Sequence, residues 1–131
     1  MAGLPHVTGF RELVVYQKAR TLCQEIFRLS KTFPKEEMYS LTDQIRRSSR
    51  SVGAQVAEAW GKRHYQKSFV SKLTDADAEQ LETQHWSDVG LDCGSLSLEQ
   101  HRELIDQLCE IGRMPASMIA KADQFCASNN D

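Results

Sequence analysis

The chain has 131 residues, of which 40% are hydrophobic and 26% charged, with a formal net charge of -2 at pH 7. This length suits a single domain whose core is large enough to fold without a metal or a disulfide, and no apolar run reaches the roughly 20 residues of a membrane span. The net charge is not the strongly positive one of most dedicated nucleic-acid-binding proteins. Only seven glycines and three prolines interrupt the sequence, which favours long helices.

The charges are divided unequally along the chain. Residues 1–67 carry 12 Lys and Arg against 6 Asp and Glu, a balance of +6, whereas residues 68–131 carry 4 against 12, a balance of -8. Two such halves can attract each other within one bundle or across a subunit interface, or they can form one basic and one acidic face. We favour complementary packing of the two halves.

The first predicted helix runs from Phe10 to about Thr32. Apolar residues recur there at alternating steps of four and three, as on one face of a helix: Val15, Ala19, Leu22, Ile26, Leu29 and Phe33. Pro34 disfavours helical backbone in the residue before it, so the helix should end just ahead of Phe33. We expect residues 1–9 and 127–131 to be flexible ends.

The second predicted helix, over residues 37–60, has a thin apolar stripe and a basic remainder. The stripe consists of small or medium side chains: Leu41, Ile45, Ser48, Val52 and Val56. Gly53 costs roughly 1 kcal/mol relative to alanine inside a helix, and with Ala54 it would let a neighbouring helix approach closely. The joint to the first helix is short, which predicts antiparallel neighbours. Gly61 should end the second helix.

The third predicted helix, over residues 64–89, has a weaker stripe. Phe69, Leu73 and Ala76 are followed by Gln80 at a position where an apolar residue is expected, and acidic residues crowd the middle of the segment. Gly90 should end this helix, because glycine is the commonest residue just past a helix C-terminus.

The fourth predicted helix runs over residues 98–126. Ser97 and Gln100 have the spacing of a capping box. Pro115 falls inside the helix and predicts either a bend near Arg113 or a break into two segments. The chain is therefore predicted to be one all-α domain over residues 1–131. Its expected architecture is an antiparallel up-down-up-down four-helix bundle with the fourth helix kinked near Pro115.

The sharpest candidate site is a basic cluster on and after the second helix. Arg46 and Arg50 lie one turn apart and face the same way, and forked guanidinium groups match phosphate oxygens. Tyr65 could stack on a base. Under a second interpretation, the same charges pair with the acidic third helix or form salt bridges between subunits. The predicted nucleic-acid-binding residues are Arg46, Arg47, Arg50, Lys62, Arg63 and Lys67.

Enzymatic and metal-binding interpretations find little support. The sequence contains no phosphate loop, dinucleotide-binding or nucleophile-elbow motif. Glu58 has no nucleophile near it in sequence, so we interpret it as half of an ion pair with an arginine of a neighbouring helix or subunit. Glu82 and His85 have the Glu-x-x-His spacing of di-iron bundles, but a second such pair is missing. We therefore predict no enzyme, no metal and no cofactor.

The cysteines and the first residues indicate the compartment. Cys23, Cys93, Cys109 and Cys126 form no Cys-x-x-Cys pair of the kind used in metal or redox sites. The opening residues MAGLPHVTGF do not resemble a signal peptide. We therefore expect free thiols and a cytoplasmic protein.

Four segments of the first half resemble one bacterial family. FRELVVYQKA (10–19), FPKEEMYSL (33–41), QIRRSSRSV (44–52) and VAEAWGKR (56–63) are similar to the four helix bundle protein family, also called the ribosomal RNA intervening-sequence protein family. Some of its members are encoded inside intervening sequences of large-subunit ribosomal RNA genes. The chain resembles a divergent member, because it departs from the family pattern at Gln55, at Ala59 and in DADAEQLE (75–82).

The resemblance implies an antiparallel four-helix bundle that assembles as a ring of five subunits, with no established enzymatic activity. The accessory protein of diversity-generating retroelements is similar in fold and assembly, and it is a basic ring that binds nucleic acid and a reverse transcriptase. We therefore expect a self-assembling bundle, a homo-pentamer away from membranes, that contacts RNA or DNA through the basic second helix. The alternative is a structural or protein-binding scaffold with no nucleic-acid role.

Overall fold

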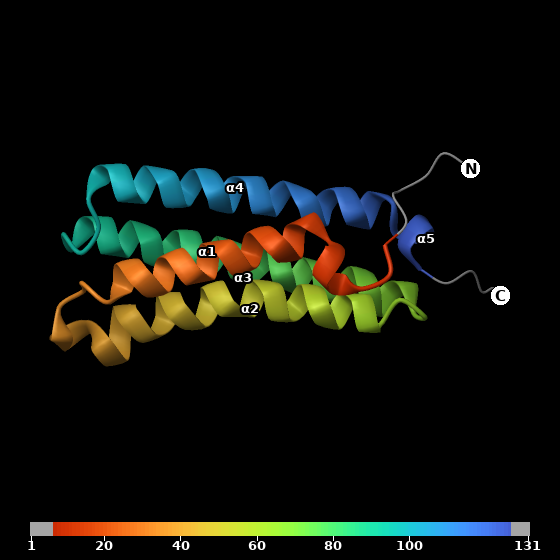
Figure 1. Ribbon diagram of the computed structural model, residues 1–131, viewed down its shortest axis with the longest axis horizontal. Coiled ribbons are helices and arrows are strands. Elements are labelled where there is room, and N and C mark those ends of the chain that lie inside the picture. The colour runs from red at the N-terminus through yellow and green to blue at the C-terminus, as the bar shows by residue number, and fades with distance from the viewer. Residues whose placement is uncertain (1–6, 127–131) are drawn as a thin grey trace.

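The computed structural model describes residues 7–126, and this part of the chain contains helices and no strand (Figure 1). Each long helix runs antiparallel to the next, which gives the up-down-up-down order. The predicted all-α four-helix bundle is therefore confirmed. The segments 1–6 and 127–131, predicted as flexible ends, lie outside the described residues. The four long helices are α1 (Val14–Ser30), α2 (Asp43–Gly61), α3 (Gln66–Asp92) and α4 (Leu98–Ala120).

Four short helical elements complete the fold. The first predicted helix starts later than expected, because Leu13 has extended backbone and separates α1 from the preceding turn. The second helix is preceded by a short 3-10 helix and then by a short π-helix. Between them, the Glu37 carboxylate accepts hydrogen bonds from Leu41 N and Ser40 Oγ. The short elements are η1 (Phe10–Glu12), η2 (Lys35–Glu37), η3 (Met38–Thr42) and α5 (Ala122–Phe125). In Figure 1, η1 and α5 lie at the same end of the bundle.

The core is built from the apolar stripes that the sequence predicts. Side chains from all four long helices are almost completely inaccessible to solvent, and Phe69 is the largest of them. Burying each such side chain stabilises the fold by roughly 1.5–3 kcal/mol. The central members are Leu22, Ile26, Ile45, Val52, Val56, Phe69, Leu73, Leu104, Leu108 and Ile111.

Gly90 does not end the third helix, contrary to the prediction. It lies inside α3, and a Cβ there would stand 2.9 Å from Leu96 Cδ1, so the missing side chain makes room for the loop that follows. The helix ends at Asp92, and two residues later the chain turns at Gly94, whose φ of +77° favours glycine. The amides of Ser95 and Leu96 then donate to the Gly90 carbonyl and close the end of the helix.

Gln80, the irregular position in the third stripe, is buried with 3% of its surface exposed. Its Nε2 donates to Asp77 Oδ1 at 2.9 Å, and its Oε1 accepts from Gln84 Nε2 at 2.8 Å. Gly112 on α4 makes the burial possible, because a Cβ at that position would lie 2.5 Å from Gln80 Nε2. A polar side chain with its hydrogen bonds thus occupies an apolar place in the α3–α4 interface.

The fourth helix begins as predicted and ends differently. Ser97 and Gln100 form the capping box, with both reciprocal hydrogen bonds present. The helix continues through the buried Pro115, so the chain does not break there. It breaks instead at Lys121, between α4 and α5. None of the helices in the range 7–126 combines the length and apolar character needed to cross a membrane.

Candidate nucleic-acid interface

The six predicted binding residues fall into two separate places. Arg46, Arg47 and Arg50 lie in the first half of α2, whereas Lys62, Arg63 and Lys67 lie around the turn between α2 and α3. At a rise of 1.5 Å per residue, positions 46 and 62 are about 24 Å apart along the helix. The residues therefore do not form one compact site.

Arg47 is engaged with the acidic third helix. Its guanidinium forms ion pairs with Glu79, at 3.5 Å, and with Glu82. Glu82 also accepts a hydrogen bond from Trp86 Nε1 at 2.9 Å. Together the Trp86 N–H and the Arg47 guanidinium hold the pKa of the Glu82 carboxyl below its usual value. The pairing with the acidic third helix that the second interpretation expects is therefore present for Arg47.

Arg46 and Arg50 turn the other way, toward α1. Arg46 Nε donates to the buried Ser30 hydroxyl at 2.7 Å. The Arg46 guanidinium lies 4.7 Å from the centroid of the Phe27 ring, and that of Arg50 lies 5.6 Å from it. Lys31 Nζ is also 4.7 Å from the same ring. Among the described residues, no carboxylate forms an ion pair with Arg46 or Arg50.

Phe27 therefore gathers Lys31, Arg46 and Arg50 along the line where α1 meets α2. Arg20 lies on the same line, 5.8 Å from the centroid of the Tyr16 ring. We call these four cations, Arg20, Lys31, Arg46 and Arg50, the basic seam. The face of an aromatic ring attracts cations, and the packing restricts where the long side chains point. The sequence analysis did not single out Arg20, Phe27 or Lys31. Their spacing on α1, at steps of seven and four, does place them on one side of that helix.

Two hollows open onto the basic seam. The larger, about 480 Å³, lies beside the start of α2 and is lined by Met38, Thr42, Asp43 and all three arginines of that helix. The smaller, about 290 Å³, lies between α1 and α2 and is lined by Arg20 and Arg50 with aromatic and small residues. Arg50 and Ala54 line both hollows, so the two adjoin.

The second group of predicted residues lies at the far end of α2. Arg63 packs on Trp60, with its guanidinium 3.6 Å from the indole ring, and its Nε donates to the Trp60 carbonyl at 2.8 Å. Lys62 and Lys67 are exposed, and 71% of the Tyr65 surface is accessible to solvent. A macromolecule could reach these side chains, but none of them lines either of the two hollows beside the basic seam.

Glu58 forms the ion pair predicted for it, but with a different partner. Its carboxylate lies 2.9 Å from Lys72 Nζ on α3, and more than half of the side chain is exposed. The expected arginine partner is therefore wrong, because the antiparallel packing of α2 and α3 brings Lys72 opposite Glu58. The carboxylate lies on the surface between the two helices rather than in the buried seam.

Glu82 and His85, which have the Glu-x-x-His spacing, differ in their surroundings from the ligands of a di-iron site. Glu82 is held by Arg47 and Trp86. Within residues 7–126, no group of three or more His, Cys, Asp or Glu side chains is placed to hold a metal ion. All four cysteines are free thiols, and burial raises the pKa of the Cys23 and Cys126 thiols.

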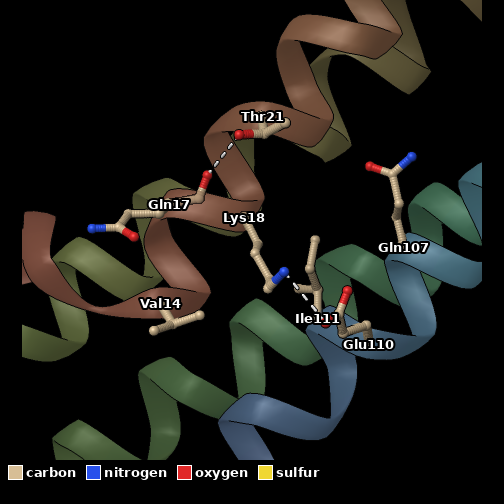
Figure 2. A pocket seen from close by; sticks show the side chains of 7 residues that line it. All are labelled: Val14, Gln17, Lys18, Thr21, Gln107, Glu110 and Ile111. Atoms are coloured by element: carbon tan, nitrogen blue, oxygen red, sulfur yellow. Dashed lines mark hydrogen bonds and ion pairs between the residues drawn. The ribbon is translucent and has the colours of Figure 1, made fainter.

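A third hollow, about 310 Å³, lies between α1 and α4 (Figure 2). Lys18 reaches across it to Glu110, with 3.3 Å between Nζ and Oε2. Nearby, Gln107 Nε2 donates to Glu25 Oε1 at 2.9 Å. With Arg47 and its two glutamates, the Lys18–Glu110 pair joins the basic first half to the acidic second half. Complementary packing of the halves is thus present in the bundle.

Comparisons with known proteins agree with the fold. A family model described as 23S rRNA-intervening sequence protein matches residues 11–117. A crystal structure of a protein with unknown function from the S23 ribosomal protein family of Bacteroides thetaiotaomicron is 28% identical, with a TM-score of 0.74. The similarity covers 82% of this chain and 96% of that one. A search of curated proteins found no match. Because the family model spans most of the sequence, this chain belongs to the 23S rRNA-intervening sequence protein family.

Proposed function

We propose that this chain is a non-enzymatic, self-assembling helical bundle that binds the phosphate backbone of RNA or DNA through the basic seam. One observation carries the proposal: Arg46 and Arg50 are positioned by Ser30 and Phe27, and neither forms an ion pair with a carboxylate among the described residues. Most of their N–H donors therefore remain available for a phosphate. Arg47 differs because its charge is already matched on α3.

The test is a pair of double charge reversals. Arg46→Glu with Arg50→Glu removes two proposed phosphate contacts, and Arg102→Glu with Arg113→Glu makes the same change in net charge at exposed sites on α4. Binding of a fluorescent 20-nucleotide strand is followed by anisotropy between 50 and 300 mM salt. We expect the first variant to bind at least about tenfold more weakly at low salt, and the second to bind like wild type.

The salt dependence gives a second, sharper readout. Each phosphate contact to a single strand contributes about -0.7 to the slope of log K against log salt. Losing two contacts should therefore make the slope shallower by about 1.4. Equal losses in the two double variants would mean that net charge alone governs binding, and the basic seam would then not be the site. The contributions of Lys62, Arg63 and Lys67 stay predictions.

A scaffold without a nucleic-acid role is the second candidate. It is favoured by apolar side chains that stand exposed on the surface of the described bundle, where a partner could cover them. Tyr39 is 92% exposed, Leu98 61% and Val14 56%. Under this second function, the bundle serves only to form a homo-pentamer or a complex with another protein. The salt series separates the two candidates, since a scaffold would not bind the 20-nucleotide strand at any salt concentration.

A further inference from the structure

The smaller hollow on the basic seam is not needed for contacts with the phosphate backbone of a nucleic acid. At about 290 Å³ it is at the small end of the range for ligand sites. Phe10 and Tyr16 form an aromatic wall on the α1 side, and Gly53, Ala54 and Ala57 form a floor of small residues on α2. A cavity of this size and lining accommodates one flat ring system.

Gly53 is not needed for helix packing. A Cβ at this position would lie 3.6 Å from Tyr16 Cε1 and 3.8 Å from Ala19 Cβ, which is ordinary van der Waals contact. Alanine would therefore fit between α1 and α2 and would also favour the helix by roughly 1 kcal/mol. The space between Gly53 and Tyr16 is thus no larger than a methyl group, and the room for a ligand lies beside them, toward Arg20, Arg50 and Ala54.

The aromatic wall is held in place. Phe10 and Tyr16 contact edge to face, with ring centroids 4.9 Å apart and an angle of 83° between the planes. Both side chains are half-buried, so part of each ring remains accessible from the hollow. Aromatic side chains of this kind stack on unpaired nucleobases in proteins that bind single strands.

Cations stand where the flanking phosphates would lie. Arg20 and Arg50 are exposed and line the same hollow, one from each helix. Arg46 follows one turn away on α2, beside the adjoining larger hollow. The basic seam thus continues past the hollow in a line parallel to the helices. A duplex must break a base pair to turn a base into such a cavity, whereas a single strand does not.

We propose that the hollow lined by Tyr16 and Ala54 receives one nucleobase of a single-stranded RNA or DNA whose neighbouring phosphates are held by Arg20, Arg46 and Arg50. The inference rests on the proposed function and adds a substrate class to it: the site prefers single strands to duplexes. It also assigns binding roles to Arg20 and Tyr16, which the sequence analysis did not consider as site residues.

The experiment fills the hollow without changing any charge. Ala54 is exposed and lines the hollow, so Ala54→Leu should occupy the space of the base. Ala78→Leu is the matched control, since Ala78 is an exposed alanine on α3. Anisotropy is measured with a 12-nucleotide strand and with the same strand in a duplex. Wild type and Ala78→Leu should bind the single strand at least about fivefold more tightly than the duplex, the lower range for one stacked base.

Ala54→Leu should lose that preference, so that its affinities for the single strand and for the duplex no longer differ. If wild type binds both forms equally, or if Ala54→Leu leaves the preference intact, the base site is wrong while the proposed function stands. If wild type binds neither form, the proposed function fails as well. Native mass spectrometry of Ala54→Leu supplies a separate check, since a change in subunit number would place this hollow in an interface between copies and overturn the inference.

Discussion

At the scale of single residues, Arg46 and Arg47 are adjacent in sequence and have different environments. Successive helix positions point about 100° apart, so Arg46 faces α1 and Arg47 faces α3. Arg46 meets a hydroxyl and an aromatic ring, whereas Arg47 meets two carboxylates. The sequence predicts a basic cluster here, but it does not say which arginine is matched, because the partners lie on other helices.

The Glu82 carboxyl makes the stability of the fold depend on pH. Its pKa is lowered in the folded state by Trp86 and Arg47, from a reference value of 4.5. A lowered pKa contributes stability that is present above the unfolded value and is lost as pH falls through the folded value. Because the pair is partly exposed, Glu82→Gln should cost no more than about 1 kcal/mol at pH 7.

Urea unfolding of wild type and Glu82→Gln between pH 3 and pH 7 tests this dependence. The difference between the two should be constant near neutral pH and should shrink as the pH falls below about 4.5. Glu103→Gln, at an exposed position on α4, is the control and should change neither the stability nor its pH profile. If the difference in unfolding free energy between wild type and Glu82→Gln did not vary with pH, the stabilisation would come from packing of the side chain and not from its charge.

At the scale of elements, the strong apolar stripes are predictable and the glycines are not. The α1 stripe and the capping box of α4 follow directly from residue spacing. Gly90 was predicted to end α3 because it precedes a loop, yet it accommodates Leu96, and the chain turns after the helix at Gly94. Gln80 breaks the α3 stripe because Gly112, far away in sequence, leaves space for it. Such long-range contacts are invisible in a local pattern.

Two glycines inside helices should respond to alanine in opposite ways. Gly53→Ala adds a methyl group in ordinary contact with Tyr16, so we expect about 1 kcal/mol of added stability. Gly112→Ala places a Cβ 2.5 Å from Gln80 Nε2 and should destabilise the fold by about 1–3 kcal/mol, even though alanine favours a helix.

Urea denaturation followed by circular dichroism measures both changes. The two substitutions have the same chemistry, so each serves as the control for the other. If both variants gained stability, the Gln80 side chain would have to rearrange at little cost, and the tight fit between α3 and α4 would not be a constraint.

At the scale of the whole molecule, the bundle presents two different seams beside α1. The α1–α2 seam has two hollows, with cations around Phe27 and Tyr16. The α1–α4 seam is joined by the Lys18–Glu110 ion pair (Figure 2) and by the hydrogen bond from Gln107 to Glu25. The fold and the family were predictable from the sequence. The division of six basic residues between two ends of α2 was not, because it required the partners on α1 and α3.

Native mass spectrometry at this scale tests the ring. With a chain mass of 14.9 kDa, we expect a species near five times that value in a gentle low-salt preparation. A ring held by apolar contacts should persist in 1 M salt, while any bound nucleic acid should dissociate, because screening weakens phosphate contacts far more than apolar ones. A monomer at all salt concentrations would remove the ring from the proposed function.

The contact between Gln80 and Gly112 also has an evolutionary consequence. Alanine at position 112 would force the Gln80 amide to move, so the effect of a change at either position depends on the residue at the other. A small residue at position 80 would relieve this contact and make Gly112→Ala less costly, but it would also remove the hydrogen-bond partner of Asp77 and Gln84. Substitutions at these two positions of α3 and α4 are therefore expected to be correlated within the family.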